Sequence, residues 1–311
     1  MGVKIVVIGG VAAGPKAAAR ARRLDPEADI TIVEQDELLS YAGCGLPYYI
    51  SGMVQDRKQL MTTPVGVMRD PAFFAKVKNI KVLNRTRAVS IDRKAKEIEV
   101  TGVDSGHTTR LPYDKLIIAT GAEPTEPPIP GKDLTNVQRL KRVEDADSFR
   151  EHLKGGVCTQ VVIVGGGLIG MEMTEAVAAC GPSVTIVEML PHVLPMIDAD
   201  MAELVEKHIR QLGVKIATGA RVERFEGDEQ GVLQRVVTSK GSFDAQLALL
   251  SIGLRPNVAL AKEAGLLIGP SGGIHVDSFL RTSDPSIYAA GDCAEKTCYV
   301  RGTSCFLPLG S

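Results

Sequence analysis

Residues 161–170 read VVIVGGGLIG, and this stretch decides the fold. Four apolar, β-branched residues end at three consecutive glycines, and an apolar segment with helical character follows to about Ala179. A second apolar strand then runs from Val184 to Glu188. Strand, glycine turn, helix and strand in this order predict one βαβ unit with parallel strands.

A second copy of this pattern opens the chain. Residues 4–14 read KIVVIGGVAAG, a helical run rich in Ala and Arg continues to Leu24, and the strand Ile30 to Glu34 follows. The same four-residue sequence, TIVE, ends both copies, at residues 31–34 and 185–188. Two such units predict an α/β protein with two Rossmann-like, three-layer nucleotide-binding domains and parallel sheets.

The segment between the copies predicts how the two domains are connected. Short alternating runs at 87–91, 97–101 and 110–113 predict a small antiparallel meander, and the proline-rich stretch 124–131 is the best linker candidate. We therefore expect one nucleotide domain to be inserted in the other. The expected bounds are residues 1–120 for the first part of the first domain, 121–249 for the inserted domain, and 250–311 for the rest of the first.

Composition excludes several other classes of protein. The 311 residues carry a formal net charge of −1, which argues against a nucleic-acid binder held by its global charge. Six cysteines without a CxxC pair are too sparse for a disulfide framework and predict no metal site. The apolar start is interrupted at Gly9, so it predicts neither a signal peptide nor a membrane span. We expect a cytoplasmic protein without nucleic-acid or membrane partners.

The glycine turns predict dinucleotide binding. A glycine at the end of the strand lets the pyrophosphate approach the free N–H groups at the start of the helix, and an acid after the second strand binds a ribose hydroxyl. Glu188 is that acid in the second copy, where it favours NADH because the 2′-phosphate of NADPH would be repelled. The other expected contacts of this copy are Gly165, Gly167, Leu168, Ile169 and Gly170.

The first copy departs from the pattern at one position, since Val11 stands where the second glycine is expected. Glu34 still occupies the place of the ribose-binding acid. The expected contacts here are Gly9, Val11, Ala12, Ala13, Gly14, Glu34 and Gln35. Two fingerprints on one chain predict two dinucleotides, which suggests a hydride donor beside a flavin.

One cysteine stands out by its surroundings. Residues 40–49 read SYAGCGLPYY, which places Cys44 in a glycine-rich loop that opens a short helix. A thiol at the start of a helix holds a larger thiolate fraction, as a nucleophilic or redox cysteine requires. From the residues alone, an inert cysteine in a glycine-rich loop is an equally open interpretation.

The order of these motifs resembles the FAD- and NAD(P)H-dependent pyridine nucleotide-disulfide oxidoreductases. Within them it is similar to the single-cysteine branch, the CoA-disulfide reductases and the NADH-dependent persulfide or polysulfide reductases. The resemblance rests on the two glycine turns with their acids, on residues 44–48 (CGLPY), on residues 119–121 (ATG) and on residues 290–292 (AGD). That family usually has Val at the position of Val11.

The resemblance implies a division of roles. The first βαβ unit would bind FAD, with Thr120 and Gly121 near its diphosphate and Asp292 on the ribityl chain, and the second would bind NADH. Cys44 would face the flavin. Hydride would pass from NADH to FAD, and the reduced flavin would reduce a mixed disulfide between Cys44 and a small thiol. Tyr49 stands where other members have a second cysteine, which excludes that dithiol.

The substrate prediction concerns the first helix. Lys16, Arg20 and Arg23 are spaced i, i+4 and i+7, so they share one face. Taken alone, this is a solvated basic face. The resemblance implies that coenzyme A lies along it, with Ser40 at a substrate-contacting position and Gly43 where the family often has Asn. The expected substrate is CoA disulfide or a CoA-linked persulfide or polysulfide.

Two alternatives remain open. One is an NADH oxidase or flavin electron-transfer protein that does not need the thiol, although Ala12 occupies the place of the active-site His of the peroxidase and oxidase branch. The other is an inactive cofactor-binding fragment. The resembled family continues into a C-terminal interface domain that forms a homodimer, and this sequence stops before it. We therefore expect that domain to be absent and dimerisation and turnover to be impaired.

Overall fold

The structure, a computed structural model, describes residues 2–308 and forms two compact units. Unit 1 contains Met1–Ala42, Lys58–Glu123 and Arg255–Ser311, and unit 2 contains Gly43–Arg57 and Pro124–Leu254. The chain therefore passes between the units four times.

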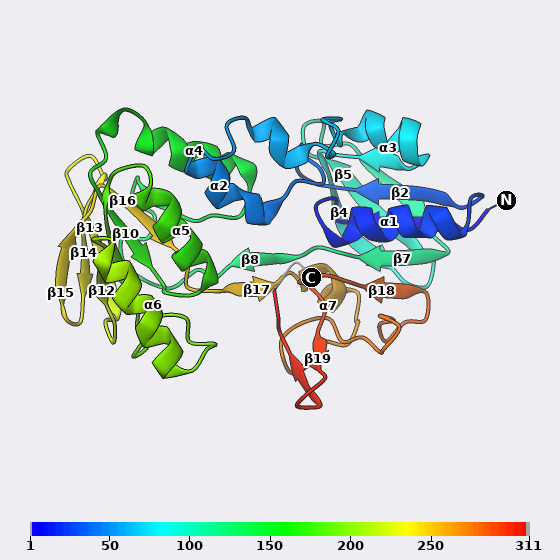
Figure 1. Ribbon diagram of the computed structural model, residues 1–311. Coiled ribbons are helices and arrows are strands. Elements are labelled where there is room, and N and C mark those ends of the chain that lie inside the picture. The colour runs from blue at the N-terminus through cyan, green and yellow to red at the C-terminus, as the bar shows by residue number, and fades with distance from the viewer. Residues whose placement is uncertain (1, 309–311) are drawn as a thin grey trace. The chain divides into compact units, whose positions relative to one another are not determined.

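Unit 1 is built on a five-stranded parallel sheet (Figure 1). Its strand order is β18-β7-β1-β2-β3, so the first glycine turn lies at the end of the central strand. The strands are β1 (Lys4–Ile8), β2 (Asp29–Val33), β3 (Lys81–Leu83), β7 (Lys115–Ile118) and β18 (Ile287–Ala289). Four β-branched residues of β1 favour the extended backbone, and the helix α1 (Ala13–Leu24) connects β1 to β2.

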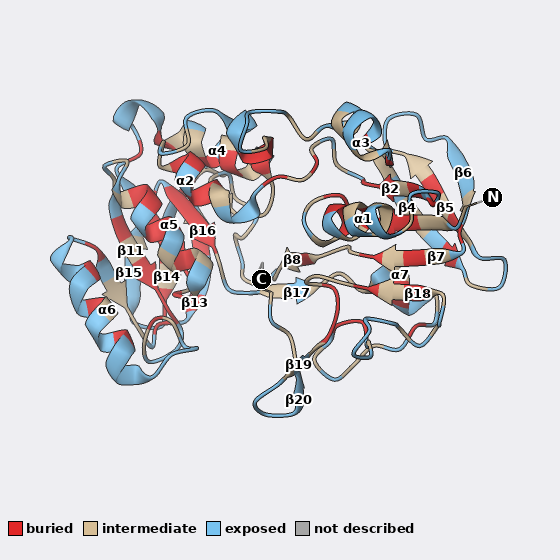
Figure 2. Ribbon diagram, turned by 45° about the vertical axis from the view of Figure 1, so that its right-hand side comes forward, coloured by how far each residue is buried: buried red, intermediate tan, exposed pale blue. Residues whose placement is uncertain are grey.

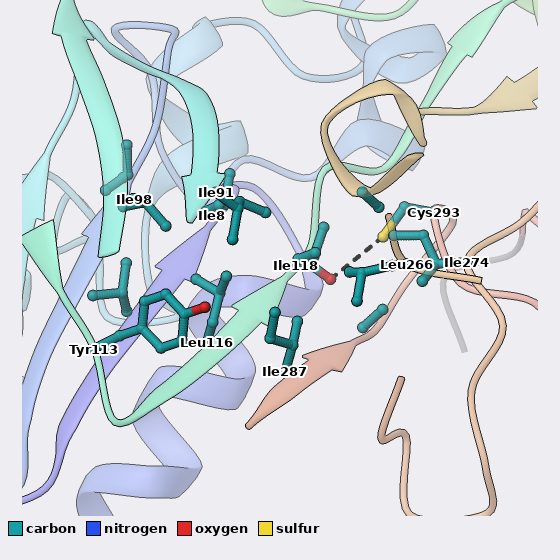
Figure 3. Close-up of a cluster of buried hydrophobic side chains, with 14 of the residues drawn as sticks. Ile8, Ile91, Ile98, Tyr113, Leu116, Ile118, Leu266, Ile274, Ile287 and Cys293 are labelled. Carbon is teal, nitrogen blue, oxygen red and sulfur yellow. Dashed lines mark hydrogen bonds between the residues drawn. The ribbon is translucent and has the colours of Figure 1, made fainter. Parts of the chain in front are cut away.

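The period-two alternation of β1 gives unit 1 its three layers. Val7 packs with Ala18 of α1 and with Phe74 of α3 (Pro71–Lys78) on one face. Val6 and Ile8 pack on the other face, against the antiparallel meander and the C-terminal part of the unit. Figure 3 shows this second core, in which Ile8, Leu116 and Ile118 of the sheet meet Ile98 of the meander. The meander strands are β4 (Thr86–Asp92), β5 (Glu97–Gly102) and β6 (Thr108–Pro112).

Unit 2 repeats this architecture. Its parallel sheet has the order β12-β11-β10-β16-β9, with the second glycine turn after the central β10. Helix α5 (Leu168–Ala178) connects β10 to β11, and an antiparallel sheet packs against the opposite face through Phe225, Leu233 and Val236. The parallel strands are β9 (Val137–Gln138), β10 (Gln160–Val164), β11 (Ser183–Val187), β12 (Lys215–Ala217) and β16 (Leu247–Leu250), and the antiparallel ones are β13 (Val222–Gly227), β14 (Leu233–Thr238) and β15 (Gly241–Asp244).

The remaining elements are short, apart from two helices of unit 2. These are α4 (Val143–Leu153) and α6 (Ala199–Gln211), whose buried faces and exposed faces are seen in Figure 2. The short elements are η1 (Gly43–Gly45), α2 (Leu46–Ile50), η2 (Arg57–Met61), β8 (Ala122–Pro124), η3 (Lys154–Gly156), β17 (Leu254–Pro256), α7 (Ala259–Glu263), β19 (Lys296–Cys298) and β20 (Thr303–Cys305).

The predicted fold class is confirmed: two parallel sheets, each wound through a βαβ unit, with an antiparallel meander. The sheet β13-β14-β15 and the two-residue strand β9 were not predicted, because their apolar positions are too few for a period to be recognised. The expected bounds of the domains also differ from the compact units, since Gly43–Arg57 packs with unit 2.

Candidate active site

The first glycine turn is shaped by two close backbone approaches. Gly9 has φ +111°, and a Cβ there would lie 2.1 Å from the carbonyl oxygen of Ala119. A Cβ on Gly14 would lie 1.9 Å from the carbonyl oxygen of Gly9. Only glycine therefore allows strand β1 to turn directly into α1, as the sequence pattern requires.

Glu34 follows β2 and closes this turn. Its side chain is buried, with 6% exposed. One carboxylate oxygen accepts a hydrogen bond from the amide of Gly10 at 2.5 Å, and the other accepts one from the amide of Asp36 at 3.0 Å. Burial raises the pKa of Glu34, while these amide hydrogen bonds oppose that rise.

The second glycine turn has the same geometry. Gly165 has φ +104°, and a Cβ on Gly170 would lie 1.9 Å from its carbonyl oxygen. Glu188 follows β11 and is 7% exposed. Its two oxygens accept hydrogen bonds from the amide of Gly166 at 2.6 Å and from the amide of Leu190 at 2.7 Å. The duplication seen in the sequence therefore extends to the hydrogen bonds of both turns.

The helices that follow the two glycine turns, α1 and α5, begin without a side chain that caps their first N–H groups. The N-cap residues are Ala12 for α1 and Gly167 for α5, and neither first turn contains an acidic residue. The first N–H groups of each helix are therefore available to an anion. A Cβ on Gly167 would meet no heavy atom within 4 Å, so there is space for a phosphate to approach the backbone. The residues fit the pyrophosphate of a dinucleotide at both turns.

The other residues predicted to bind FAD lie at the carboxyl edge of the unit 1 sheet. Thr120 and Gly121 follow β7. The Thr120 hydroxyl donates to the backbone carbonyl of Asn257 at 2.7 Å, and the backbone amide of Asn257 donates to the carbonyl of Gly121 at 2.9 Å. Asp292 follows β18, and a Cβ on the preceding Gly291 would lie 2.9 Å from Cβ of Ala13 at the start of α1. The sheet thus brings residues from three distant segments to one edge.

Three predicted residues beside the first turn are placed by the backbone. Gln35 is exposed and directly follows Glu34. Val11 is half-buried just before the N-cap of α1. Ser40 has φ +48°, and its amide donates to the carbonyl of Gly10 at 2.8 Å, so the loop after β2 is attached to the glycine turn.

Cys44 lies in unit 2, exposed in the 3₁₀ turn η1 that precedes α2. Leu46, Pro47 and Ile50 of α2 are buried, whereas Gly43 and Cys44 are exposed. The hydroxyl of Tyr49 donates to Asp147 of α4 at 2.7 Å. Burial and the carboxylate of Asp147 both raise the pKa of Tyr49, so the phenol remains a donor.

The other cysteines are less accessible. Cys293 is fully buried, and its thiol donates to the carbonyl of Ile118 at 3.4 Å (Figure 3). Burial raises the pKa of Cys293, Cys158 and Cys180. Cys298 and Cys305 are half-buried in the hairpin of β19 and β20. Within residues 2–308, Cys44 is the one exposed thiol.

The basic face predicted on α1 is present. Lys16, Arg20 and Arg23 are all exposed. The neighbouring Arg22 differs, because its guanidinium donates to the backbone carbonyls of Asp25, Pro26 and Asn79 at 2.6–3.4 Å. Arg22 therefore holds the end of α1 in place, while the other three cations face solvent.

Residues 2–308 contain no group of three or more His, Cys, Asp or Glu side chains arranged to hold a metal ion. None of the helices in this range is long and apolar enough to cross a membrane.

Comparison with known proteins identifies the family. The model of the pyridine nucleotide-disulphide oxidoreductase family matches residues 3–304. The chain belongs to this family, whose members are flavoproteins that use FAD and a nicotinamide nucleotide. The predicted family, the FAD and NADH cofactors and the enzyme class, an NAD(P)H-dependent flavoprotein oxidoreductase, are confirmed.

Individual relatives differ in the activity that their names give. The chain is 33% identical over 310 residues to an NADH oxidase of Methanocaldococcus jannaschii, covering 99% of this chain and 67% of that protein. It is 34% identical over 307 residues to an NAD(P)H coenzyme A polysulfide/persulfide reductase of Pyrococcus horikoshii, covering 98% and 66%. It is 43% identical to the solved NAD-dependent persulfide reductase of A. fulgidus, with a TM-score of 0.95, covering 99% and 56%.

The chain thus spans about two thirds of the length of these curated relatives and 56% of the solved one. The predicted homodimer and the predicted contacts of individual residues stay predictions. Sequence reasoning missed Asp147 and Asn257, which hold distant loops by their side chains. The Asp147 carboxylate accepts from Tyr49, and the side-chain amide of Asn257 donates to the carbonyl of Thr120 at 3.0 Å. A single sequence contains no signal for such pairs, because they are distant along the chain.

Proposed function

We propose that this protein is an NADH-dependent, FAD-containing reductase of CoA disulfide or of a CoA-linked persulfide or polysulfide, with Cys44 as the reacting thiol. The observation that carries the proposal is the exposure of Cys44 in a glycine-rich turn before α2. The relatives from Pyrococcus horikoshii and A. fulgidus, whose names give persulfide reductase activities, support the choice of substrate class.

Each glycine turn has one cofactor in this proposal. Unit 1 holds FAD through the turn at Gly9, the acid Glu34, and Thr120, Gly121 and Asp292 at the same sheet edge. Unit 2 holds NADH through the turn at Gly165, Gly167 and Gly170 with Glu188. A fixed carboxylate at Glu188 accepts ribose hydroxyls and repels a 2′-phosphate, so NADH is preferred to NADPH. FAD supplies the relay of two electrons between NADH and the thiol.

Cys44 performs the sulfur chemistry. Its thiolate attacks one sulfur of the disulfide, forms a mixed disulfide with one CoA and releases the other CoA as a thiolate. Two electrons that originate from NADH then cleave the mixed disulfide, releasing the second CoA thiolate and restoring the Cys44 thiolate. Tyr49, five residues after Cys44, cannot form an internal disulfide, so the mixed disulfide is the oxidised resting form.

The basic face of α1 is the proposed site for the phosphates of CoA. Lys16, Arg20 and Arg23 are exposed on unit 1, and guanidinium groups bind phosphate oxygens in a bidentate manner. Ser40 and Gly43 are the proposed contacts near the thiol end of the substrate. Because Gly43 has no side chain, only its backbone groups can contact the pantetheine arm.

The test is the substitution Cys44→Ser. NADH-driven reduction of CoA disulfide is expected to disappear, while reduction of the flavin by NADH under anaerobic conditions remains. The control is Cys298→Ser, which removes a half-buried thiol outside the proposed site and should leave both steps unchanged. Full disulfide reduction by Cys44→Ser contradicts the proposal, and a protein whose flavin NADH cannot reduce is an inactive cofactor-binding chain.

An NADH oxidase that does not need the thiol is the second candidate. It is favoured by the relative of Methanocaldococcus jannaschii, whose name gives that activity. The same variant separates the two functions, because oxygen consumption with NADH would survive in Cys44→Ser. Ala12 offers no imidazole at the start of α1, which disfavours peroxide chemistry that depends on such a group.

A further inference from the structure

The segment that contains Cys44 packs on α4 and α5 of unit 2, and one acidic side chain of α4 contacts it at two places. Asp147 lies on α4 and is half-buried. One of its carboxylate oxygens accepts the hydroxyl hydrogen bond of Tyr49 at 2.7 Å, and the other pairs with the guanidinium of Arg57 at 2.7 Å. Tyr49 lies in the middle of the segment Gly43–Arg57 and Arg57 is its last residue, so Asp147 holds the segment at two points.

A second residue of α4 reinforces this attachment. Arg150 lies one turn after Asp147, and its guanidinium is 4.5 Å from the centroid of the Tyr49 ring. The same side chain donates to the backbone carbonyl of Gln55 at 3.0 Å. Residues three apart on a helix share a face, so α4 presents a carboxylate and a guanidinium together to the segment. Figure 1 shows α2 beside α4 and α5, all within unit 2.

Cys44 itself has no comparable attachment. It is exposed, and within residues 2–308 its side chain has no hydrogen bond or ion pair. Its place is therefore determined by the backbone of η1 and α2. Helix α2 has only five residues, which is too short to be stable without packing. The contacts of Tyr49 with α4, together with the buried Leu46 and Ile50, are thus part of the packing that determines the place of Cys44.

We infer that Asp147, supported by Arg150, is the positioning residue for the Cys44 thiol. Its inferred role is indirect: it holds Tyr49 and Arg57, and through them the turn that presents the thiol. This inference rests on the proposed function for its catalytic consequence, whereas its structural part concerns the segment alone.

Three variants test the inference. Asp147→Ala removes both contacts, and Tyr49→Phe removes only the hydroxyl and keeps the ring beside Arg150. Glu151→Gln is the matched control, because Glu151 lies on the same helix and pairs with Lys154 at 2.5 Å, both side chains being exposed. Amide hydrogen exchange of the flavin-loaded protein is measured for residues 43–57 and, as an internal reference, for residues 160–187.

In Asp147→Ala we expect the amides of residues 43–57 to exchange at least about tenfold faster, with an intermediate effect in Tyr49→Phe and none in Glu151→Gln. Residues 160–187 should be unchanged. Disulfide reduction should fall at least about tenfold, while the rate of flavin reduction by NADH stays within about twofold. A role in general stability alone would change all of these readouts together.

The inference is overturned if exchange in residues 43–57 is unchanged in Asp147→Ala, or if residues 160–187 exchange faster to the same degree. It is also overturned if the segment loosens and disulfide reduction keeps its rate. Failure of the proposed function has a different signature, full disulfide reduction by Cys44→Ser. In that case the exchange data and the rate of Cys44 alkylation, read by mass spectrometry, still decide the role of Asp147.

Discussion

The carboxylate of Glu188 and the backbone amide of Gly166 are joined by a hydrogen bond of 2.6 Å. Glu34 and Gly10 have the same relationship at 2.5 Å in the other unit. Each acid therefore holds the glycine turn that it accompanies, in addition to its proposed role in binding the ribose. Since a carboxylate has about four lone-pair sites, it can still accept hydrogen bonds from ribose hydroxyls.

Nucleotide preference should follow the charge at Glu188. In the double variant Glu188→Ala, Met189→Arg, we expect NADH affinity to fall about tenfold and NADPH affinity to rise, because a guanidinium can pair with the 2′-phosphate. Met189 is 62% exposed, so the substitution causes no burial of charge. Dissociation constants for both nucleotides measure the effect. The control is Glu175→Ala, which removes an exposed acid elsewhere on α5 and should leave both affinities unchanged. Unchanged NADPH affinity in the double variant would refute the role of Glu188.

Two glycines of the second turn should respond differently to alanine. Gly170→Ala brings a Cβ to 1.9 Å from the Gly165 carbonyl oxygen, so we expect a loss of at least about 2 kcal/mol in the free energy of unfolding. Gly167→Ala meets no atom within 4 Å and should cost less than about 1 kcal/mol. Its methyl group would nevertheless stand where we propose that the pyrophosphate approaches, so NADH affinity should fall about tenfold. Chemical unfolding and NADH titration separate the effects, and unimpaired NADH binding by Gly167→Ala would contradict the predicted phosphate position.

The basic face of α1 can be tested without disturbing the fold. The double variant Arg20→Gln, Arg23→Gln should lower the affinity for CoA about tenfold, since each lost guanidinium removes a charge-assisted bond to phosphate. The melting temperature should not change, because both side chains are exposed. Arg22→Gln is the converse control: it loses hydrogen bonds to three carbonyls, so it should lower the melting temperature and leave CoA affinity unchanged. Equal CoA affinity in the double variant and the native protein would show that this face of α1 does not bind CoA.

Thiol labelling should distinguish the cysteines by burial. With iodoacetamide at neutral pH, peptide mapping is expected to find Cys44 alkylated first and Cys293 and Cys158 protected until the protein unfolds. Burial raises the pKa of both protected thiols, which lowers their thiolate fraction as well as their accessibility. Labelling in denaturant is the control that all six cysteines can react. Protection of Cys44 in the folded protein would argue against its proposed role.

Stability at alkaline pH should depend on Tyr113. Its ring is buried in the second core of unit 1, and burial, with the nearby Asp284, raises its pKa from 10.0 to about 12. Between these values the folded state keeps a proton that the unfolded state has lost, so the free energy of unfolding falls as pH rises, by up to about 3 kcal/mol. Tyr113→Phe should remove that part of the decline between pH 10 and 12, as measured by urea unfolding. An unchanged pH slope in this variant would exclude Tyr113 as its source.

The sequence by itself determined the two βαβ units, their glycine turns and their acids. These features are local: apolar alternation, the requirement for glycine at Gly9 and Gly165, and the acid after each second strand act over about 30 residues. The helix α1 and the meander were predicted for the same reason, and the structure confirms both.

Only the tertiary structure decided where the segment of Cys44 packs. The sequence placed it with the first domain because it follows β2 directly, yet Tyr49 and Arg57 contact Asp147, which lies 98 and 90 residues further along the chain. The bond from Thr120 to Asn257 and the pairing of β9 with β16 are likewise long-range. Such contacts depend on complementary shape and charge between distant residues, which have no spacing that a single sequence reveals.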